Sequence, residues 1–97
     1  MLHTISTSPF QTQALQRCLR YLGPEDEILL IQDAVVAGIE KNTWCETLAL
    51  AGVKIYLLEA DLLARGLRGQ VVDGFYIVDL SGFVELTVRH DTQMKWA

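Results

Sequence analysis

The sequence is poor in proline, which interrupts helices, and in cysteine, which can form disulfide crosslinks. Its 97 residues include only two prolines and two cysteines, while 51% of the residues are hydrophobic. This composition excludes a disordered linker, and the length predicts one compact domain over residues 1–97. Folding at this size buries roughly 60 to 68% of the surface of the unfolded chain, so contacts with other subunits would add stability.

Long apolar runs are also missing. No stretch reaches the roughly 18 to 20 apolar residues that cross a bilayer, and Leu2–Thr4 lacks the basic start of a signal peptide. We therefore expect no membrane insertion and a cytoplasmic protein. Cys18 and Cys45 stand 27 positions apart without a CxxC motif, so we expect two reduced thiols and no disulfide.

Basic residues are few. Eight Lys and Arg stand against twelve Asp and Glu, which gives a net charge of −4 and a pI near 4.9. A phosphate backbone requires a basic face, so direct nucleic-acid binding is not expected. No glycine-rich turn follows the first apolar run, so we also expect no phosphate-bearing cofactor.

What the chain does contain is a repeated alternation of short apolar runs and helical patterns. We predict strands at Leu2–Ser6, Ile28–Ile31, Val53–Leu57, Phe75–Val78 and Thr92–Trp96. We predict helices at Pro9–Leu22, Ala34–Ile39, Thr43–Gly52, Glu59–Arg65 and Asp79–His90. Such an order is typical of an α/β protein, here a small three-layer flavodoxin-like domain with about five mostly parallel strands and helices on both faces.

Three of the apolar runs are followed by an acid, namely Asp33, Glu59 and Asp79. The carboxyl ends of parallel strands are where ligands collect in this fold class, so these acids are candidates for acid–base chemistry. Each also stands where a helix needs an N-terminal cap, and we interpret them first as caps. Thr43 and Glu46 have the spacing of a capping box.

Cys18 is the one candidate nucleophile. Arg17 and Arg20 would favour its thiolate, but Cys18 lies on the apolar stripe of a helix, where burial raises a thiol pKa. From spacing alone we favour a core thiol. His3 and His90 have no ligand at metal-binding spacing, so no metal site is predicted; His90 and Asp91 could form a hydrogen-bonded pair.

Met94 and Trp96 alternate with polar residues at the end of the chain, the pattern of an edge strand. Two large apolar side chains at a sheet edge are difficult to bury in a small monomer. Trp and Met are also enriched at subunit contacts, so we predict an interface here.

Several segments resemble the TusB/DsrH family of the DsrE/DsrF/DsrH-like group. The resemblance covers nearly the whole chain. It rests on Leu2–Thr4 with Ser8-Pro9, on Leu29–Asp33, on Asp61–Leu67, and on Gly82–Thr87 with Trp96. One departure is Asp33-Ala34, where family members commonly have Asp-Gly.

The resemblance implies an accessory, non-catalytic subunit of a cytoplasmic heterohexamer made of two TusB-TusC-TusD trimers. Such a complex passes persulfide sulfur, through a partner's cysteine and a TusE-like acceptor, towards 2-thiouridine at tRNA wobble positions. DsrH-type members of sulfur-oxidising bacteria often carry a cysteine in the first helix, where Cys18 falls. The alternative is therefore a sulfurtransferase in its own right, with Cys18 as persulfide acceptor. Without partners, we expect a homo-oligomer.

Overall fold

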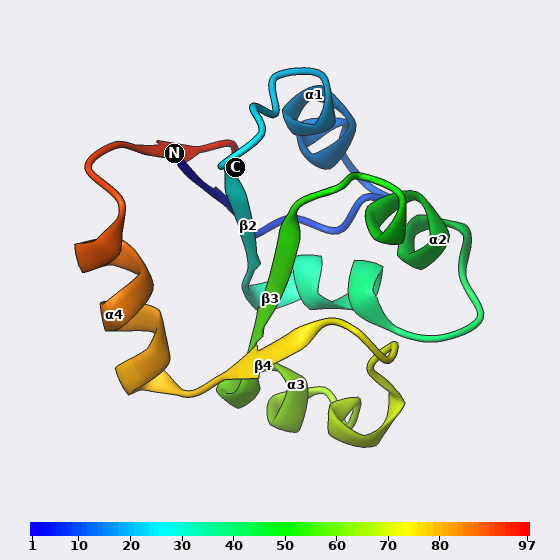
Figure 1. The fold of residues 1–97 in the computed structure, drawn as a ribbon. Helices are drawn as coiled ribbons and strands as arrows, with labels where there is room; N and C mark the ends of the chain where they lie inside the picture. Colours follow the sequence, from blue (N-terminus) through cyan, green and yellow to red (C-terminus); the bar gives the residue numbers. More distant parts are fainter.

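The computed structural model describes residues 1–97 and has a five-stranded sheet at its centre. The strands are β1 (Leu2–Ile5), β2 (Glu27–Leu30), β3 (Lys54–Leu58), β4 (Tyr76–Val78) and β5 (Gln93–Lys95). Their order across the sheet is β4-β3-β2-β1-β5, and every neighbouring pair is parallel. This confirms the predicted α/β class and the predicted sheet (Figure 1).

Helices lie on both faces of this sheet. They are α1 (Ala14–Leu19), α2 (Thr43–Ala49), α3 (Glu59–Ala64) and α4 (Leu80–Arg89), with 3-10 helices η1 (Gln32–Gly38) and η2 (Arg68–Gln70). No helix is long and apolar enough to cross a membrane.

One face of the sheet carries most of the core. Alternate residues of each strand point to opposite faces, so Ile28 and Leu30 of β2 lie on one side and Leu29 on the other. Ile28 and Leu30 belong to a cluster of 14 buried residues to which α1, η1, α2 and α3 also contribute.

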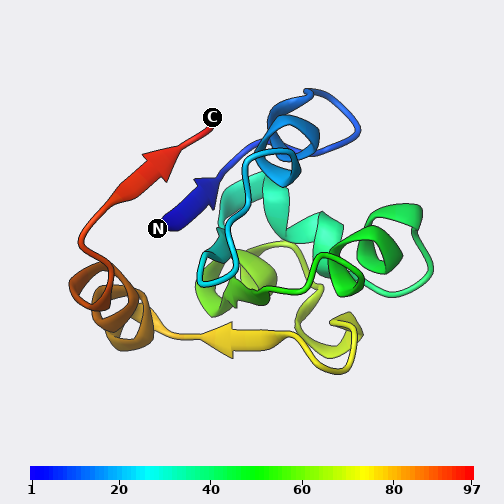
Figure 2. The ribbon, with the colours of Figure 1, turned by 45° about the horizontal axis from the view of Figure 1, so that its top comes forward.

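The opposite face is covered by α4 alone. This helix connects β4 at one edge of the sheet to β5 at the other edge (Figure 2). Between it and the sheet lies a cluster of only four buried residues, of which Leu86 belongs to α4 itself and the others are Leu2, Leu29 and Tyr56 of the strands. The two hydrophobic layers are therefore unequal, and the α4 side is thinly covered.

Two predicted helices differ from those observed. The first was expected from Pro9 but begins at Ala14, because the N–H groups of Gln11 and Thr12 both bond to the Ser8 carbonyl in a separate turn. The segment expected as an α-helix over Ala34–Ile39 is the 3-10 helix η1, whose N-cap makes no side-chain hydrogen bond.

The cap of α2 lies one residue earlier than predicted. Asn42, not Thr43, accepts from the N–H groups of Trp44 at 2.8 Å and Cys45 at 3.2 Å. Asparagine is among the residues most favoured at the N-cap position, and Asn42 takes that position in place of Thr43. The predicted capping box of Thr43 and Glu46 therefore does not form.

The last two helices follow their local signals closely. Gly66, at φ 67, supplies the left-handed residue after α3. Asp79 caps α4 by accepting from the Gly82 N–H at 2.8 Å, which confirms the predicted helix despite its β-branched residues.

Candidate functional site

The acids at the carboxyl ends of the strands do not form one site. Asp33 was predicted as a cap but pairs with Arg65 at 2.8 Å, and Glu59 pairs with Arg68 at 3.1 Å. Only Asp79 is a cap. Since Asp33, Glu59 and Asp79 each have a different partner, these three acids do not converge on one ligand.

Cys18 lies in the core. Its side chain is fully buried on α1, and burial, with a smaller effect from the charge of Asp26, raises the pKa of the thiol to about 12. Cys45 is also buried, and its thiol donates to the carbonyl of Asn42 at 3.0 Å. Both cysteines are free, as predicted, and neither lies at the surface.

Trp96 directly follows β5 and is hydrogen-bonded to a buried histidine. We call Met94 and Trp96 together the β5 edge. The Trp96 indole N–H donates to Nδ1 of His3 at 2.9 Å, and Nε2 of His3 lies 2.8 Å from an oxygen of Asp26. The ring of Tyr21 lies against Trp96 at a centroid distance of 5.4 Å. Trp96 is thus half-buried, whereas 43% of Met94 is exposed.

These side chains surround a pocket of about 480 Å³. Its lining includes the apolar side chains of Tyr21, Met94 and Trp96 and the polar side chains of His3 and Asp26. Both ring nitrogens of His3 are already bonded, so the pocket offers mainly apolar surface. The structure thus brings Met94 and Trp96 together in one cavity and leaves Cys18 outside its lining.

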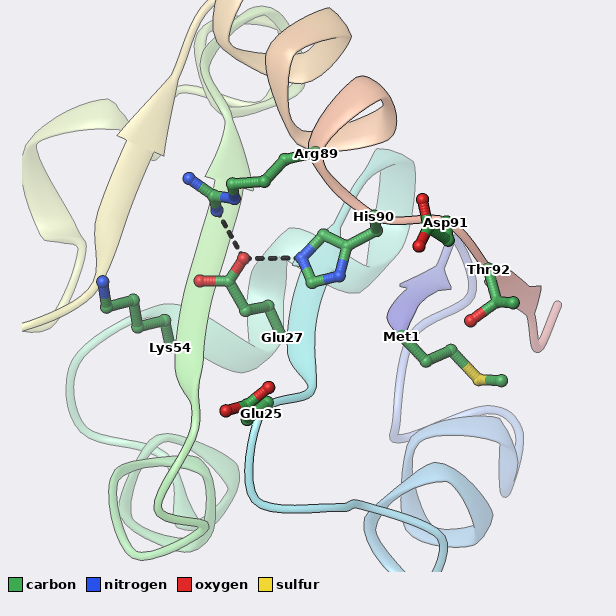
Figure 3. A pocket seen from close by; sticks show the side chains of 8 residues that line it. All are labelled: Met1, Glu25, Glu27, Lys54, Arg89, His90, Asp91 and Thr92. Atoms are coloured by element: carbon green, nitrogen blue, oxygen red, sulfur yellow. Dashed lines mark hydrogen bonds and ion pairs between the residues drawn. The ribbon is translucent and has the colours of Figure 1, made fainter.

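A second cavity, of about 560 Å³, lies at the amino ends of the strands (Figure 3). At its centre Glu27 accepts hydrogen bonds from the Tyr56 hydroxyl at 3.0 Å and from Arg89, while His90 Nε2 lies 2.7 Å from the same carboxylate. The rim includes Lys54.

Glu27 is held as a carboxylate. Burial alone would raise its pKa, but the bonds from His90, Arg89 and Tyr56 outweigh burial and keep the pKa below its usual range. No nucleophilic cysteine or serine lines this cavity, and no group of three or more metal-ligating side chains occurs in the structure. The cluster attaches the end of α4 to the sheet.

Sequence reasoning missed this cluster. Glu27 falls outside the strand predicted at Ile28–Ile31, and His90 was paired with Asp91 rather than with Glu27, 63 positions away. One signal was available in the sequence. Glu27 directly precedes the continuous apolar run Ile28–Ile31, so the strand could include it as its first residue.

The fold and these cavities define a small α/β protein with one parallel sheet and no exposed nucleophilic cysteine. Two solved structures share the fold. The crystal structure of the ychN protein from E. coli superposes with a TM-score of 0.77 at 20% identity, covering 97% of both chains. The solution structure of protein Tm0979 from Thermotoga maritima gives 0.67 at 22% identity, covering 95% of this chain and 97% of that one.

Closer relatives identify the family. A family model described as DsrH like protein matches residues 7–93. Protein TusB of Escherichia coli strain K12 is 45% identical over 96 residues, which cover 99% of this chain and 100% of that protein, and Protein TusB of Shigella flexneri matches to the same extent. The chain belongs to the DsrH-like family, as the resemblance in its sequence implied.

Proposed function

We propose that this chain is an accessory subunit of a TusBCD-like sulfur-relay complex. The complex passes persulfide sulfur towards 2-thiouridine at tRNA wobble positions. The observation that carries the proposal is the 45% identity to Protein TusB over essentially the whole length of both chains. Partners are TusC-like and TusD-like subunits in a cytoplasmic heterohexamer of two trimers, with a TusE-like acceptor downstream.

The state of the thiols supports an accessory role. A sulfur carrier needs an accessible thiolate, because the thiolate is the form that attacks or accepts sulfur. Cys18 and Cys45 are both buried, and the pKa of Cys18 is about 12. In this arrangement the sulfur travels on a partner's cysteine, and this chain binds no cofactor of its own.

The β5 edge supports a role in assembly. Met94 is exposed beside the apolar pocket that Tyr21 and Trp96 line. Methionine and aromatic side chains around such a pocket are typical of the centre of a protein interface. We assign one subunit contact to this edge.

Co-expression with the TusC-like and TusD-like paralogues tests the proposal. The wild-type chain should elute with both in one assembly on size-exclusion chromatography, and Met94→Glu should be lost from it. Leu50→Glu is the matched control, because 87% of Leu50 is exposed and it follows α2, away from β5. If the wild-type chain elutes alone with both paralogues present, the proposed function is wrong.

The alternative, with Cys18 as persulfide acceptor, has a direct test of its own. It requires α1 to move so that the buried thiol meets a donor. Persulfide-selective labelling after exposure to a loaded donor protein should modify the wild-type chain but not Cys18→Ser if the alternative holds. We expect equal, background labelling of both.

A further inference from the structure

The two histidines of the chain are both bonded to carboxylates, but their second ring nitrogens have different surroundings. Nε2 of His3 lies 2.8 Å from Asp26, and Nε2 of His90 lies 2.7 Å from Glu27. Nδ1 of His3 accepts the indole N–H of Trp96 at 2.9 Å, whereas no protein group bonds Nδ1 of His90. A second proton would therefore meet a donor on His3 and none on His90.

The bond between Trp96 and His3 requires that Nδ1 of His3 carries no proton. An indole nitrogen can only donate. A protonated imidazole carries a hydrogen on each nitrogen and accepts from neither. Protonation of His3 would place two N–H donors opposite each other, and this hydrogen bond would be lost.

Asp26 favours a second proton on His3 from the other side of the ring. Burial alone would raise the pKa of Asp26. Hydrogen bonds from Gly23, His3 and the α-amino group of Met1 outweigh burial and hold that pKa well below its usual range. Asp26 thus stays a carboxylate where histidines titrate, and a protonated His3 would bond it as an ion pair, which is stronger than a neutral hydrogen bond.

The elements around His3 add no further charge that changes on acidification. In the sheet register its partners are the uncharged Ile28 of β2 and Met94 of β5. On α1, burial, with a smaller effect from the charge of Asp26, raises the pKa of Cys18 to about 12, so this thiol stays neutral.

Two other titratable groups line the pocket beside His3, namely the Tyr21 hydroxyl and the α-amino group of Met1. Neither loses a proton as the pH falls. The response to acid in this pocket therefore belongs to His3.

We propose that His3 is a pH-sensitive switch that holds the Trp96 ring when neutral and releases it when protonated. The added proton strengthens the bond to Asp26 and removes the acceptor of the indole. The backbone of Trp96 stays in place, because its N–H donates to the Thr4 carbonyl at 3.0 Å. The change is confined to the indole ring, which leaves Tyr21 and opens the pocket at the β5 edge. This switch operates in the chain by itself and does not depend on the proposed function.

His90 provides an internal comparison. No buried polar side-chain atom of the structure lacks a partner, so the unbonded Nδ1 of His90 is reached by solvent. A second proton can enter there while Nε2 keeps its bond to Glu27. Protonation of His90 alone therefore breaks no hydrogen bond of the protein.

Nuclear magnetic resonance of the two tryptophan indole N–H groups tests the proposal, and Trp96→Phe assigns their signals. Between about pH 8 and about pH 5, where histidines titrate, the Trp96 signal should shift towards that of an exposed indole. The shift should have the same midpoint as the ring signals of His3. The signal of Trp44 on α2 should stay constant, and His90→Gln should leave the shift of Trp96 unchanged.

His3→Gln separates the switch from a general effect of acid. The Gln amide has an acceptor oxygen for Trp96 and a donor nitrogen for Asp26, and it does not titrate. The Trp96 signal of this variant should therefore stay constant over the same pH range. If circular dichroism shows that His3→Gln is unfolded, the shared midpoint of Trp96 and His3 in the wild-type chain decides.

Three results would overturn the proposal. A Trp96 signal that stays constant in the wild-type chain shows that the indole is not released. A shift that persists in folded His3→Gln, or that follows the midpoint of His90, shows that another group releases it. A shift of Trp44 together with Trp96 shows that acid unfolds the chain instead.

Discussion

The indole N–H of Trp96 donates a hydrogen bond to Nδ1 of His3 at 2.9 Å, which ties the end of β5 to β1. An indole nitrogen only donates, so Nδ1 of His3 carries no proton. Nε2 of His3 then carries the proton and donates it to Asp26 at 2.8 Å. One neutral tautomer of His3 thus serves both partners.

Trp96→Phe should destabilise the protein by about 1–3 kcal/mol, because it leaves Nδ1 of the buried His3 without a donor. Urea unfolding followed by circular dichroism measures the change. Met94→Ala is the control. Because Met94 is 43% exposed, this substitution should change the free energy of unfolding by no more than about 0.5 kcal/mol. Equal effects of the two substitutions would show that the hydrogen bond contributes nothing.

Glu27→Gln should lower the free energy of unfolding by about 1–3 kcal/mol near neutral pH, since Gln cannot replace a carboxylate that accepts from three side chains. Hydrogen exchange should also quicken in α4, which the cluster attaches to the sheet. Glu85→Gln, an exposed change on the same helix, should do neither.

The effect of Glu27 should depend on pH. The pKa of Glu27 is lower in the folded protein than in the unfolded chain. Its contribution to the free energy of unfolding is therefore fully present above about pH 4.3, the usual pKa of a glutamate. That contribution is lost as the pH falls through the lower, folded pKa. Urea curves across this range should bring wild type and Glu27→Gln together at acid pH; a constant difference would contradict the assignment.

Cys18 should react very slowly with a thiol reagent in the native protein. It is fully buried and its pKa is about 12, so almost no thiolate forms at mildly alkaline pH. The variant Cys45→Ala leaves Cys18 as the single thiol. The reaction of Cys18 with a chromogenic disulfide reagent can then be followed by absorbance, with and without urea. Rapid reaction without urea would contradict the buried position.

Gly38→Ala should destabilise by about 1–3 kcal/mol, as overpacking of a core does. A Cβ at Gly38 would stand 2.6 Å from Cδ2 of Leu57, so η1 could not approach β3 as closely. Gly69→Ala is the matched control, because a Cβ there meets nothing within 4 Å. Equal melting temperatures for the two variants would show that this close approach is not required.

Local signals were sufficient for the sheet. The predicted segments place all five strands to within one residue at each end, and Asp79 and Gly66 act at their helix ends as predicted. These features depend on residues a few positions apart, which is why composition and spacing reveal them.

Local signals failed where two good options compete. Asn42 and Thr43 are both suitable caps, and the extended backbone of Asn42 decides between them. Ser8 and Pro9 start a turn as readily as a helix, and the turn forms. Asp33 and Glu59 were expected as caps, but each lies within reach of an arginine.

The α/β class and the parallel sheet could be predicted from the sequence, because apolar periodicity and capping residues act over short distances, and the resemblance of several segments indicated the family. Only the tertiary structure decided that Glu27 meets Tyr56 and His90, that His3 holds Trp96, and that α4 covers one face alone. These contacts join residues 29 to 93 positions apart. They exist because parallel pairing places β3 beside β2, β2 beside β1 and β1 beside β5, which no local pattern encodes.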